Sequence, residues 1–188
     1  MTRRWAIEYS FLLVLCVIFV IIPYHYANEQ LRRLQEFDLQ LKMEREALRL
    51  QQEAFLAEQR NRQKICLATN IYHEARGETE KGKQAVAQVT INRTQSDKFP
   101  DDICGVVYEG CQFSWYCDGL SDDIRDEKAW NDSLRVANDA LEGRTVGAVP
   151  NNAVYYHSTR VKPRWARTKK FIAMIGKHIF YAERVQSS

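Results

Sequence analysis

Glu74 and Glu78 are the first residues whose type and spacing could do chemistry, because paired carboxylates carry out general acid–base catalysis. They lie four residues apart in the segment YHEARGE. Gly77 interrupts the predicted helix between them, so the two side chains need not share a face. Glu78 is equally well explained as part of the cap of the next helix, together with Thr79. Taken alone, Glu74 could also be an exposed helix-end residue paired with Arg76.

Three histidines suggest a second chemistry. His73, His157 and His178, with Glu74, could supply the imidazole and carboxylate ligands of a zinc centre. No tightly spaced ligand pair of the H-E-x-x-H kind is present, since His73 and Glu74 are adjacent. We therefore expect no metal site and no cofactor.

These residues belong to the last 124 of the 188 residues, a length sufficient for one hydrophobic core. Apolar spacing, caps and glycines predict helices at about residues 64–75, 80–93, 126–141 and 168–176. Short strand-like pieces are predicted at residues 106–108, 112–116, 153–157 and 178–181. The predicted fold class is α+β, dominated by helices, with a small irregular sheet.

Blocks of sequence in this part of the chain resemble a known family. The run NIYHEARGE, followed by GKQAVAQVTINR, resembles the SleB/CwlJ-type cell-wall hydrolases, which cut peptidoglycan. The blocks DICGVVYEGCQFSWYCDG, VYYHSTRVKPRWA and IGKHIFY follow in matching order. The resemblance covers essentially all of residues 65–188 and implies a lysozyme-like fold related to lytic transglycosylases. In that fold a Glu at the C-terminal end of a helix protonates the glycosidic oxygen, and Glu74 fits this position.

The resemblance implies cleavage of the glycan backbone between N-acetylmuramic acid and N-acetylglucosamine, with Glu74 as acid and base. If no second carboxylate takes part, a transglycosylase is favoured, in which the sugar's own 6-hydroxyl attacks. The substrate-binding candidates offer aromatic faces or polar groups suited to a sugar groove: Tyr72, Glu78, Gln112, Phe113, Ser114, Tyr156 and His157. Two alternatives stay open: a zinc-dependent N-acetylmuramoyl-L-alanine amidase and an inactive peptidoglycan-binding tether.

Residues 1–26 are predicted to be a single transmembrane signal-anchor. They contain the unbroken apolar run FLLVLCVIFVII, flanked by aromatic residues that suit a membrane interface. Arg3 and Arg4 precede the run, so the N-terminus should stay in the cytoplasm and the rest should be exported through the inner membrane. The alternative, a cleaved signal peptide, lacks a small-x-small cleavage site.

Residues 27–64 are predicted to be a helical spacer, because they contain neither Gly nor Pro. Leu34, Leu41, Leu48 and Phe55 recur every seven residues, whereas the second seam position is mostly polar. Such a half coiled coil is compatible with a weak homodimer or with a single solvated helix.

Cysteine and charge content complete the prediction. Cys66, Cys104, Cys111 and Cys117 all lie in the exported part, where two disulfides of undetermined connectivity are expected.

The chain holds 27 basic and 24 acidic residues, a net charge of +3, which excludes a strongly basic nucleic-acid arm. A basic run at residues 160–170 is interpreted first as a solvated face and second as a contact for anionic wall carboxylates. The expected partners are therefore peptidoglycan and the membrane, and not nucleic acid.

Overall fold

The computed structural model describes residues 13–145 and 147–184, and the chain divides into two compact units, Met1–Leu56 and Ala57–Ser188. The start of the predicted transmembrane segment, including Arg3 and Arg4, lies outside the described residues.

The described part of the first unit is helical. A π-helical turn at Val17–Ile21 precedes helix α2, which spans Ile22–Ala75 and contains the boundary between the units. Its N-terminal portion belongs to the one described helix that is long and apolar enough to cross a membrane, judged by length and composition. Ion pairs three or four residues apart, such as Lys42 with Asp38 at 2.6 Å, line the polar part of α2. Such pairs support an isolated helix modestly.

The second unit contains the end of α2 and three further α-helices among the described residues: α3 at Glu80–Thr94, α4 at Ile103–Tyr108 and α5 at Glu127–Leu141. Its described strands are β1 at Ala153–Ser158, β2 at Lys170–Ile175 and β3 at His178–Ala182. Short 3-10 helices lie at Ser114–Tyr116 and Arg164–Thr168. The predicted helix-dominated α+β class is therefore confirmed.

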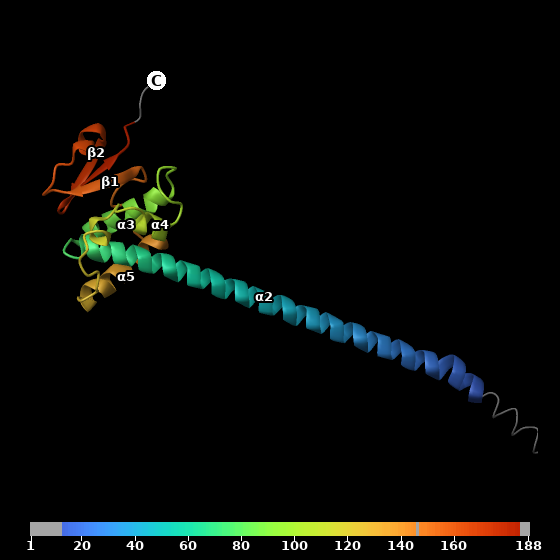
Figure 1. Ribbon diagram of the computed structural model, residues 1–188. Coiled ribbons are helices and arrows are strands. Elements are labelled where there is room, and N and C mark those ends of the chain that lie inside the picture. Colours follow the sequence, from blue (N-terminus) through green and yellow to red (C-terminus); the bar gives the residue numbers. More distant parts are fainter. Residues whose placement is uncertain (1–12, 146, 185–188) are drawn as a thin grey trace, which may run out of the picture. The chain divides into compact units, whose positions relative to one another are not determined.

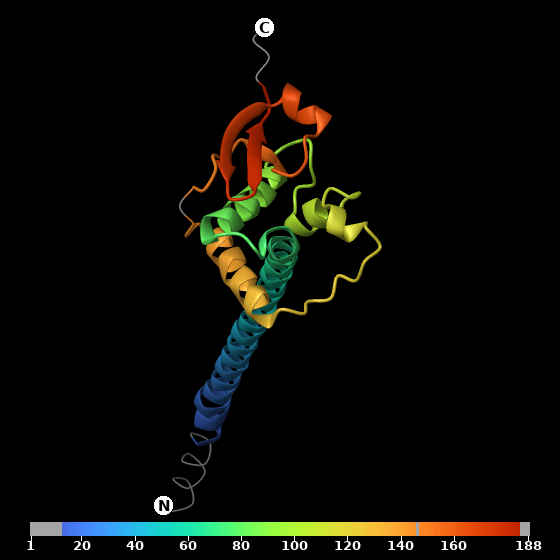
Figure 2. The same cartoon turned by 90° about the vertical axis from the view of Figure 1, so that its left-hand side faces the viewer.

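The described strands form one antiparallel sheet in the order β1-β3-β2. Helix α3 lies between this sheet and α5 (Figures 1 and 2). One core cluster joins the end of α2 to α4 and α5 and includes Leu67, Ile71 and Val106. A second joins α3 to the sheet through Val89 and Phe180. The first cluster also includes a residue of α3, so the end of α2 and the strand β1 both pack on α3, which fixes the residues that these two elements carry.

Side-chain caps set the starts of the three shorter helices. The hydroxyl of Thr79 accepts the backbone N–H of Gly82 at 3.3 Å, and Asp126 accepts that of Ala129 at 2.9 Å. Asp102 caps α4 in the same way by accepting the N–H of Gly105 at 3.0 Å. These contacts satisfy amide groups that would otherwise lack a partner at a helix N-terminus. The predicted boundaries of α3 and α5 agree with the structure because their caps are visible in the sequence.

Three predicted elements were wrong. Residues 106–108 form the end of helix α4, because the Asp102 cap and helical packing outweigh the strand preference of Val106 and Val107. Residues 112–116 form a turn and a 3-10 helix. Residues 170–175 form strand β2, although a helix was predicted at 168–176. Gly176 adopts a φ of +55° in the turn between β2 and β3, and this turn directs the segment into a hairpin.

Two disulfides are present among the described residues, and this confirms the prediction. Cys66 on α2 is bonded to Cys104 on α4, and Cys111 is bonded to Cys117. The first pair joins the end of α2 to α4, and the second closes a short loop beside the 3-10 helix at Ser114–Tyr116. Cys16 is exposed and free.

Candidate active site

A cleft of about 370 Å³ opens where the end of α2, the 3-10 helix after α4, the end of β1 and the β2–β3 turn meet. It is more polar than a typical apolar ligand pocket, as expected of a site for a hydroxyl-rich ligand. The residues that line it are His73, Glu74, Arg76, Gly77, Glu78, Ser114, Trp115, Asp118, Ser158, Arg160, Lys177 and His178.

Glu74 lies one residue before the end of α2, and its side chain enters the cleft. Its Oε2 accepts a hydrogen bond from the hydroxyl of Tyr156 at 3.1 Å. Burial raises the pKa of Glu74, while the Tyr156 hydroxyl and the positive charge of Arg93 act in the opposite direction and limit the rise. A carboxyl group with a raised pKa is suited to donate a proton near neutral pH.

Tyr156 on β1 connects Glu74 to a buried cation. Burial raises the pKa of Tyr156 well above its ordinary value of 10, and the nearby charge of Glu74 raises it further. The hydroxyl therefore keeps its proton and can donate to Glu74 at neutral pH. The guanidinium of Arg93 lies 6.0 Å from the Tyr156 ring centroid and 5.1 Å from that of Phe113, distances typical of cation–π contacts.

The end of α3 holds β1 in place through two adjacent side chains. Asn92 donates from Nδ2 to the carbonyls of Pro150 and Ala153, at 3.0 and 2.8 Å. Arg93 donates from Nε to the carbonyl of Val154 at 2.9 Å. Both side chains are buried, where unpaired polar groups are costly. Asn92 and Arg93 therefore fix the strand that carries Tyr156.

The opposite wall of the cleft is aromatic. Trp115 donates from Nε1 to Oδ1 of the buried Asn70 at 3.3 Å, and Asn70 donates in turn to Thr90 at 3.1 Å. His73 stacks on Trp115 with ring centroids 4.4 Å apart and an interplanar angle of 16°. Burial lowers the pKa of His73, which favours a neutral ring beside Glu74. The wall thus presents a flat aromatic face that is held by hydrogen bonds from beneath.

Glu78 is bound to the β2–β3 turn. Its Oε2 accepts the backbone N–H of Lys177 at 3.1 Å. The helix cap at this point is Thr79, whose hydroxyl accepts the N–H of Gly82. A Cβ added to Gly176 would lie 1.8 Å from Glu78 Oε2, so the carboxylate rests directly against the turn. Glu78 lines the cleft and at the same time holds the turn that carries Lys177 and His178.

Replacing Gly176 by Ala is expected to lower the free energy of unfolding by about 2 kcal/mol. About half comes from the φ of +55°, and the rest from displacement of the Glu78 carboxylate. Gly143→Ala is the matched control, because Gly143 has a φ of +68° but no atom near an added Cβ, and should lose only about 1 kcal/mol. Urea titrations followed by tryptophan fluorescence measure both values. Equal losses in the two variants would show that the Glu78 contact contributes nothing.

The structure brings together only part of the predicted site. Glu74, Glu78 and Ser114 line the cleft, and Tyr156 is bonded to Glu74 from beneath. Phe113 is buried in the core under Arg93.

The other three predicted residues lie outside the cleft lining. Tyr72 is fully buried, and its hydroxyl accepts the backbone N–H groups of Arg125 and Asp126, both at 3.1 Å. Gln112 is exposed outside the cleft. His157 is paired through Nε2 with the Tyr181 hydroxyl at 3.0 Å. Consecutive strand residues face opposite sides of a sheet, so Tyr156 and His157 cannot both point toward Glu74.

The histidine set weighed for zinc is not assembled. His73 and His178 line the cleft with Glu74, but His157 lies on the other face of the sheet with Trp165, 5.6 Å between ring centroids. Within residues 13–145 and 147–184, no group of three His, Cys, Asp or Glu side chains has the arrangement of a metal site.

Sequence reasoning missed several cleft residues. His178 is buried, its ring packs edge-on against Tyr156 at 5.2 Å, and burial lowers its pKa. Arg160 and Lys177 contribute exposed cations, and Asp118 an exposed carboxylate. Lys177 and His178 belong to the block IGKHIFY, which resembles the family. They line the cleft with Glu74 because of the β2–β3 hairpin, which was not predicted.

Replacing Tyr156 by Phe is expected to shift the alkaline limb of the pH–rate profile to higher pH. The Tyr156 hydroxyl lowers the pKa of Glu74, so its removal raises that pKa further and keeps the acid protonated to higher pH. Tyr155→Phe is the control, because Tyr155 faces the other side of β1 and donates to Glu183 at 2.5 Å. The profile of initial cleavage rates against pH checks the prediction. An unchanged limb in Tyr156→Phe would contradict the role given to this hydrogen bond.

Comparison with known proteins gives the class of this chain. The sequence profile of the family described as Cell Wall Hydrolase matches residues 77–181, more than half of the chain. The chain therefore belongs to the cell wall hydrolase family, and this confirms the resemblance to SleB/CwlJ-type enzymes and the prediction of an enzyme domain of that kind. Glu74 lies three residues before the first matched residue.

The relatives are spore enzymes. The chain is 36% identical over 114 residues to a spore cortex-lytic enzyme of Halalkalibacterium halodurans, a match that covers 61% of this chain and 33% of that protein. It is 36% identical over 116 residues to the enzyme of the same name from Oceanobacillus iheyensis, covering 61% and 39%. The chain thus spans between a third and two fifths of the length of these relatives.

One solved structure supports the fold. The catalytic domain of the germination-specific lytic transglycosylase SleB from Bacillus anthracis superposes with a TM-score of 0.51 at 31% identity. The match covers 63% of this chain and 93% of that domain. The globular unit therefore has a SleB catalytic-domain fold.

Proposed function

We propose that this protein is a membrane-anchored lytic transglycosylase that cleaves the glycan backbone of peptidoglycan, with Glu74 as its single catalytic acid and base. The observation that carries the proposal is the environment of Glu74. Its carboxyl group lines the cleft, and burial raises the pKa of this group. Membership of the cell wall hydrolase family supports the substrate class.

In the proposed reaction the protonated Glu74 gives its proton to the glycosidic oxygen as the bond from C1 breaks. The muramyl 6-hydroxyl then attacks C1, and the Glu74 carboxylate takes the proton that this hydroxyl loses. The product carries a 1,6-anhydro ring, no water is consumed, and Glu74 returns to its protonated form. Tyr156 holds the carboxyl in position through both steps.

A single-carboxylate mechanism is supported by how the other acids of the cleft are placed. Glu78 accepts the N–H of Lys177 and rests against the β2–β3 turn, so its carboxylate is already used to hold that turn. Asp118 lies in the exposed loop after the 3-10 helix at Ser114–Tyr116. The described hydrogen bond of the Tyr156 hydroxyl goes to Glu74 and to neither of these two carboxylates.

Mass spectrometry of purified walls digested with the full-length protein tests the proposal. Anhydromuramyl ends are expected. Reducing ends would show hydrolysis, and released intact peptides would show an amidase. Binding without any product would favour the inactive tether.

The anchor is part of the same proposal. The apolar helix in the first unit supports a single-pass anchor in the inner membrane, and two disulfides support an extracytoplasmic globular unit, because disulfides persist in oxidising compartments. Protease treatment of spheroplasts should degrade the globular unit while the cytoplasm stays intact. Protection from protease in intact spheroplasts would contradict this orientation.

We also propose that the spacer supports a weak homodimer. Leu34, Leu48 and Phe55 are all more than half exposed on α2, as expected of a seam that needs a second helix. Disulfide cross-linking of a Leu41→Cys variant tests it. Absence of a concentration-dependent dimer would favour a single solvated helix.

A further inference from the structure

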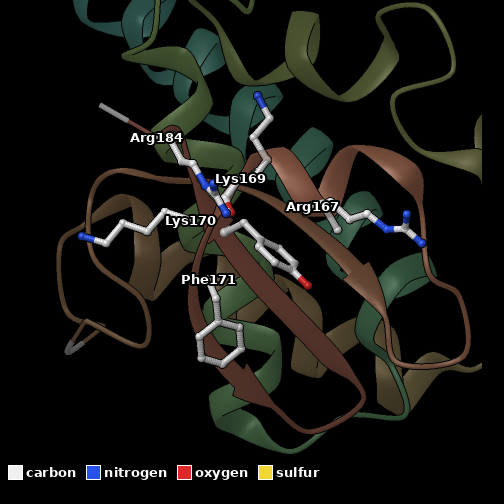
Figure 3. Close-up of a pocket in the computed structure, with 7 residues that line it drawn as sticks. Arg167, Lys169, Lys170, Phe171 and Arg184 are labelled. Carbon is white, nitrogen blue, oxygen red and sulfur yellow. The ribbon is translucent and has the colours of Figure 1, made fainter. Parts of the chain in front are cut away.

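A second concave surface lies at the far end of the β2–β3 hairpin from the cleft. It has a volume of about 620 Å³ and is lined by Ala166, Arg167, Lys169, Lys170, Phe171, Tyr181 and Arg184. We call it the basic groove. Figure 3 shows Arg167 and Lys170 on opposite sides of this groove, with Arg184 and Phe171 between them.

The cations of the basic groove are available to a ligand. Arg167, Lys170 and Arg184 are exposed and form no ion pair with any residue that the structure describes. Residues 147–184 contain eight lysines and arginines but one acid, Glu183. The local field is therefore positive although the whole chain is nearly neutral.

The single acidic residue of this segment, Glu183, already forms ion pairs. Glu183 pairs with Lys98 at 2.6 Å and with Lys169 at 2.7 Å, and these contacts hold its pKa at about 2. Lys169 is thereby neutralised and fixed at the back of the groove. The remaining cations project from a rigid base, so less freedom is lost when they bind an anion.

The groove also has an apolar part. Phe171 is 59% exposed, and its ring lies edge-on to Tyr181 with centroids 6.2 Å apart. A purely inorganic anion would make no use of this surface. Exposed aromatic side chains beside cations suit a ligand that carries both carboxylates and alkyl segments.

The hairpin relates the groove to the cleft. Lys177 and His178 line the cleft at the turn, whereas Lys170 pairs with Ala182 at the other end of the strands. Five residue steps along β2 correspond to about 17 Å. Tyr181 of the groove is paired with His157 on the face of the sheet opposite to Tyr156, and β2 is the edge strand. A side branch of a polymer in the cleft therefore reaches the groove around this edge.

We propose that the basic groove binds the carboxylate-bearing peptide stems of peptidoglycan, and this inference rests on the proposed function. The guanidinium of Arg167 and the ammonium of Lys170 contact stem carboxylates, and Phe171 packs on an alkyl side chain of the stem. The groove thereby selects glycan strands that still carry peptides and holds them while the backbone lies in the cleft.

The test compares two double variants in a Glu74→Gln background, in which sacculi should stay intact. The first is Arg167→Glu with Lys170→Glu. The second, Lys81→Glu with Lys128→Glu, makes the same change in net charge at exposed helix positions away from the groove. Full-length proteins in detergent are co-sedimented with sacculi from which attached phosphate polymers have been removed. The groove variant should bind about tenfold more weakly at low salt, and the control should bind as the parent does.

Two further arms identify the ligand. Converting the carboxylates of the sacculi to amides should lower parental binding to the level of the groove variant. Unchanged binding to amidated sacculi, or binding that disappears when the phosphate polymers are removed, would overturn the proposal. Equal binding by the two double variants would overturn it as well. Unfolding midpoints in urea, equal for both, exclude misfolding.

Cleavage assays with Glu74 restored separate this inference from the proposed function. The groove variant should cleave peptide-free glycan strands at the parental rate but lose activity on stem-bearing peptidoglycan. A parental protein that cleaves neither substrate would refute the proposed function, while the co-sedimentation result would still decide the role of the groove. Equal losses on both substrates would show that the groove does not recognise stems.

Discussion

Replacement of Glu74 by Gln is expected to reduce glycan cleavage about a thousandfold while leaving the fold intact. Gln has nearly the same shape, and its carbonyl can still accept the Tyr156 hydrogen bond that Glu74 accepts at 3.1 Å. It has no acidic proton to give to the glycosidic oxygen and cannot take one from the attacking hydroxyl. Initial rates of anhydromuropeptide release, quantified by mass spectrometry, measure the loss.

Two neighbouring acids provide controls. Glu80 is paired with Arg135 at 2.8 Å on the surface, so Glu80→Gln should leave the rate unchanged. Glu78→Gln keeps an acceptor for the Lys177 N–H and should lose no more than about tenfold. A loss in Glu78→Gln as large as that in Glu74→Gln would instead identify a second catalytic carboxylate. Full activity in Glu74→Gln would refute the assignment of the acid.

The raised pKa of Glu74 also predicts how stability depends on pH. Because burial favours the protonated form, the stabilising contribution of this group is present below its ordinary pKa of 4.5 and is lost as pH rises through the raised value. Gln does not ionise and escapes this loss. Glu74→Gln should therefore be at least as resistant to urea as the parent at pH 8. A marked loss of stability would mean that the carboxylate has a structural role.

The position of Glu74 near the end of a helix could be predicted from the sequence, but much of its surroundings could not. Glu74 stands at the end of a helix within a recognisable block, and Gly77 marks that end. Arg93 contacts Tyr156, which lies 63 positions further along the chain, through a guanidinium that is buried against aromatic rings. Nothing in local spacing distinguishes such an arginine from a solvated one.

The fold was predicted best where local signals and tertiary packing agree. Helix α5 begins at the Asp126 cap and ends before Gly143, and both signals are local. The segment at 170–175 contains residues that suit either a helix or a strand, and pairing with β3 decides between them. Because a helix was predicted for this segment, the β2–β3 hairpin was not predicted, nor was the position of Lys177 and His178 in the cleft lining.

The two disulfides are expected to differ in their contribution to stability. Cys66 and Cys104 are 38 residues apart, whereas Cys111 and Cys117 are 6 apart. A cross-link restricts the unfolded chain more when it closes a longer loop. Replacing the first pair by Ser should therefore lower the free energy of unfolding by about 4 kcal/mol, and the second pair by about 2 kcal/mol. Urea titrations of the variants, with Cys16→Ser as the unaffected control, give these values.

The short disulfide offers a sharper comparison, because Cys111 has a φ of +55°. A side chain strains the backbone in this region, and glycine does not. Cys111→Gly with Cys117→Ser should therefore be about 1 kcal/mol more stable than Cys111→Ser with Cys117→Ser. Both variants loosen the loop beside Trp115 and should weaken substrate binding before they unfold the core. Equal stability of the two variants would contradict this expectation. It would mean that the backbone at residue 111 relaxes when the disulfide is removed, and that the disulfide is what keeps this residue at a positive φ.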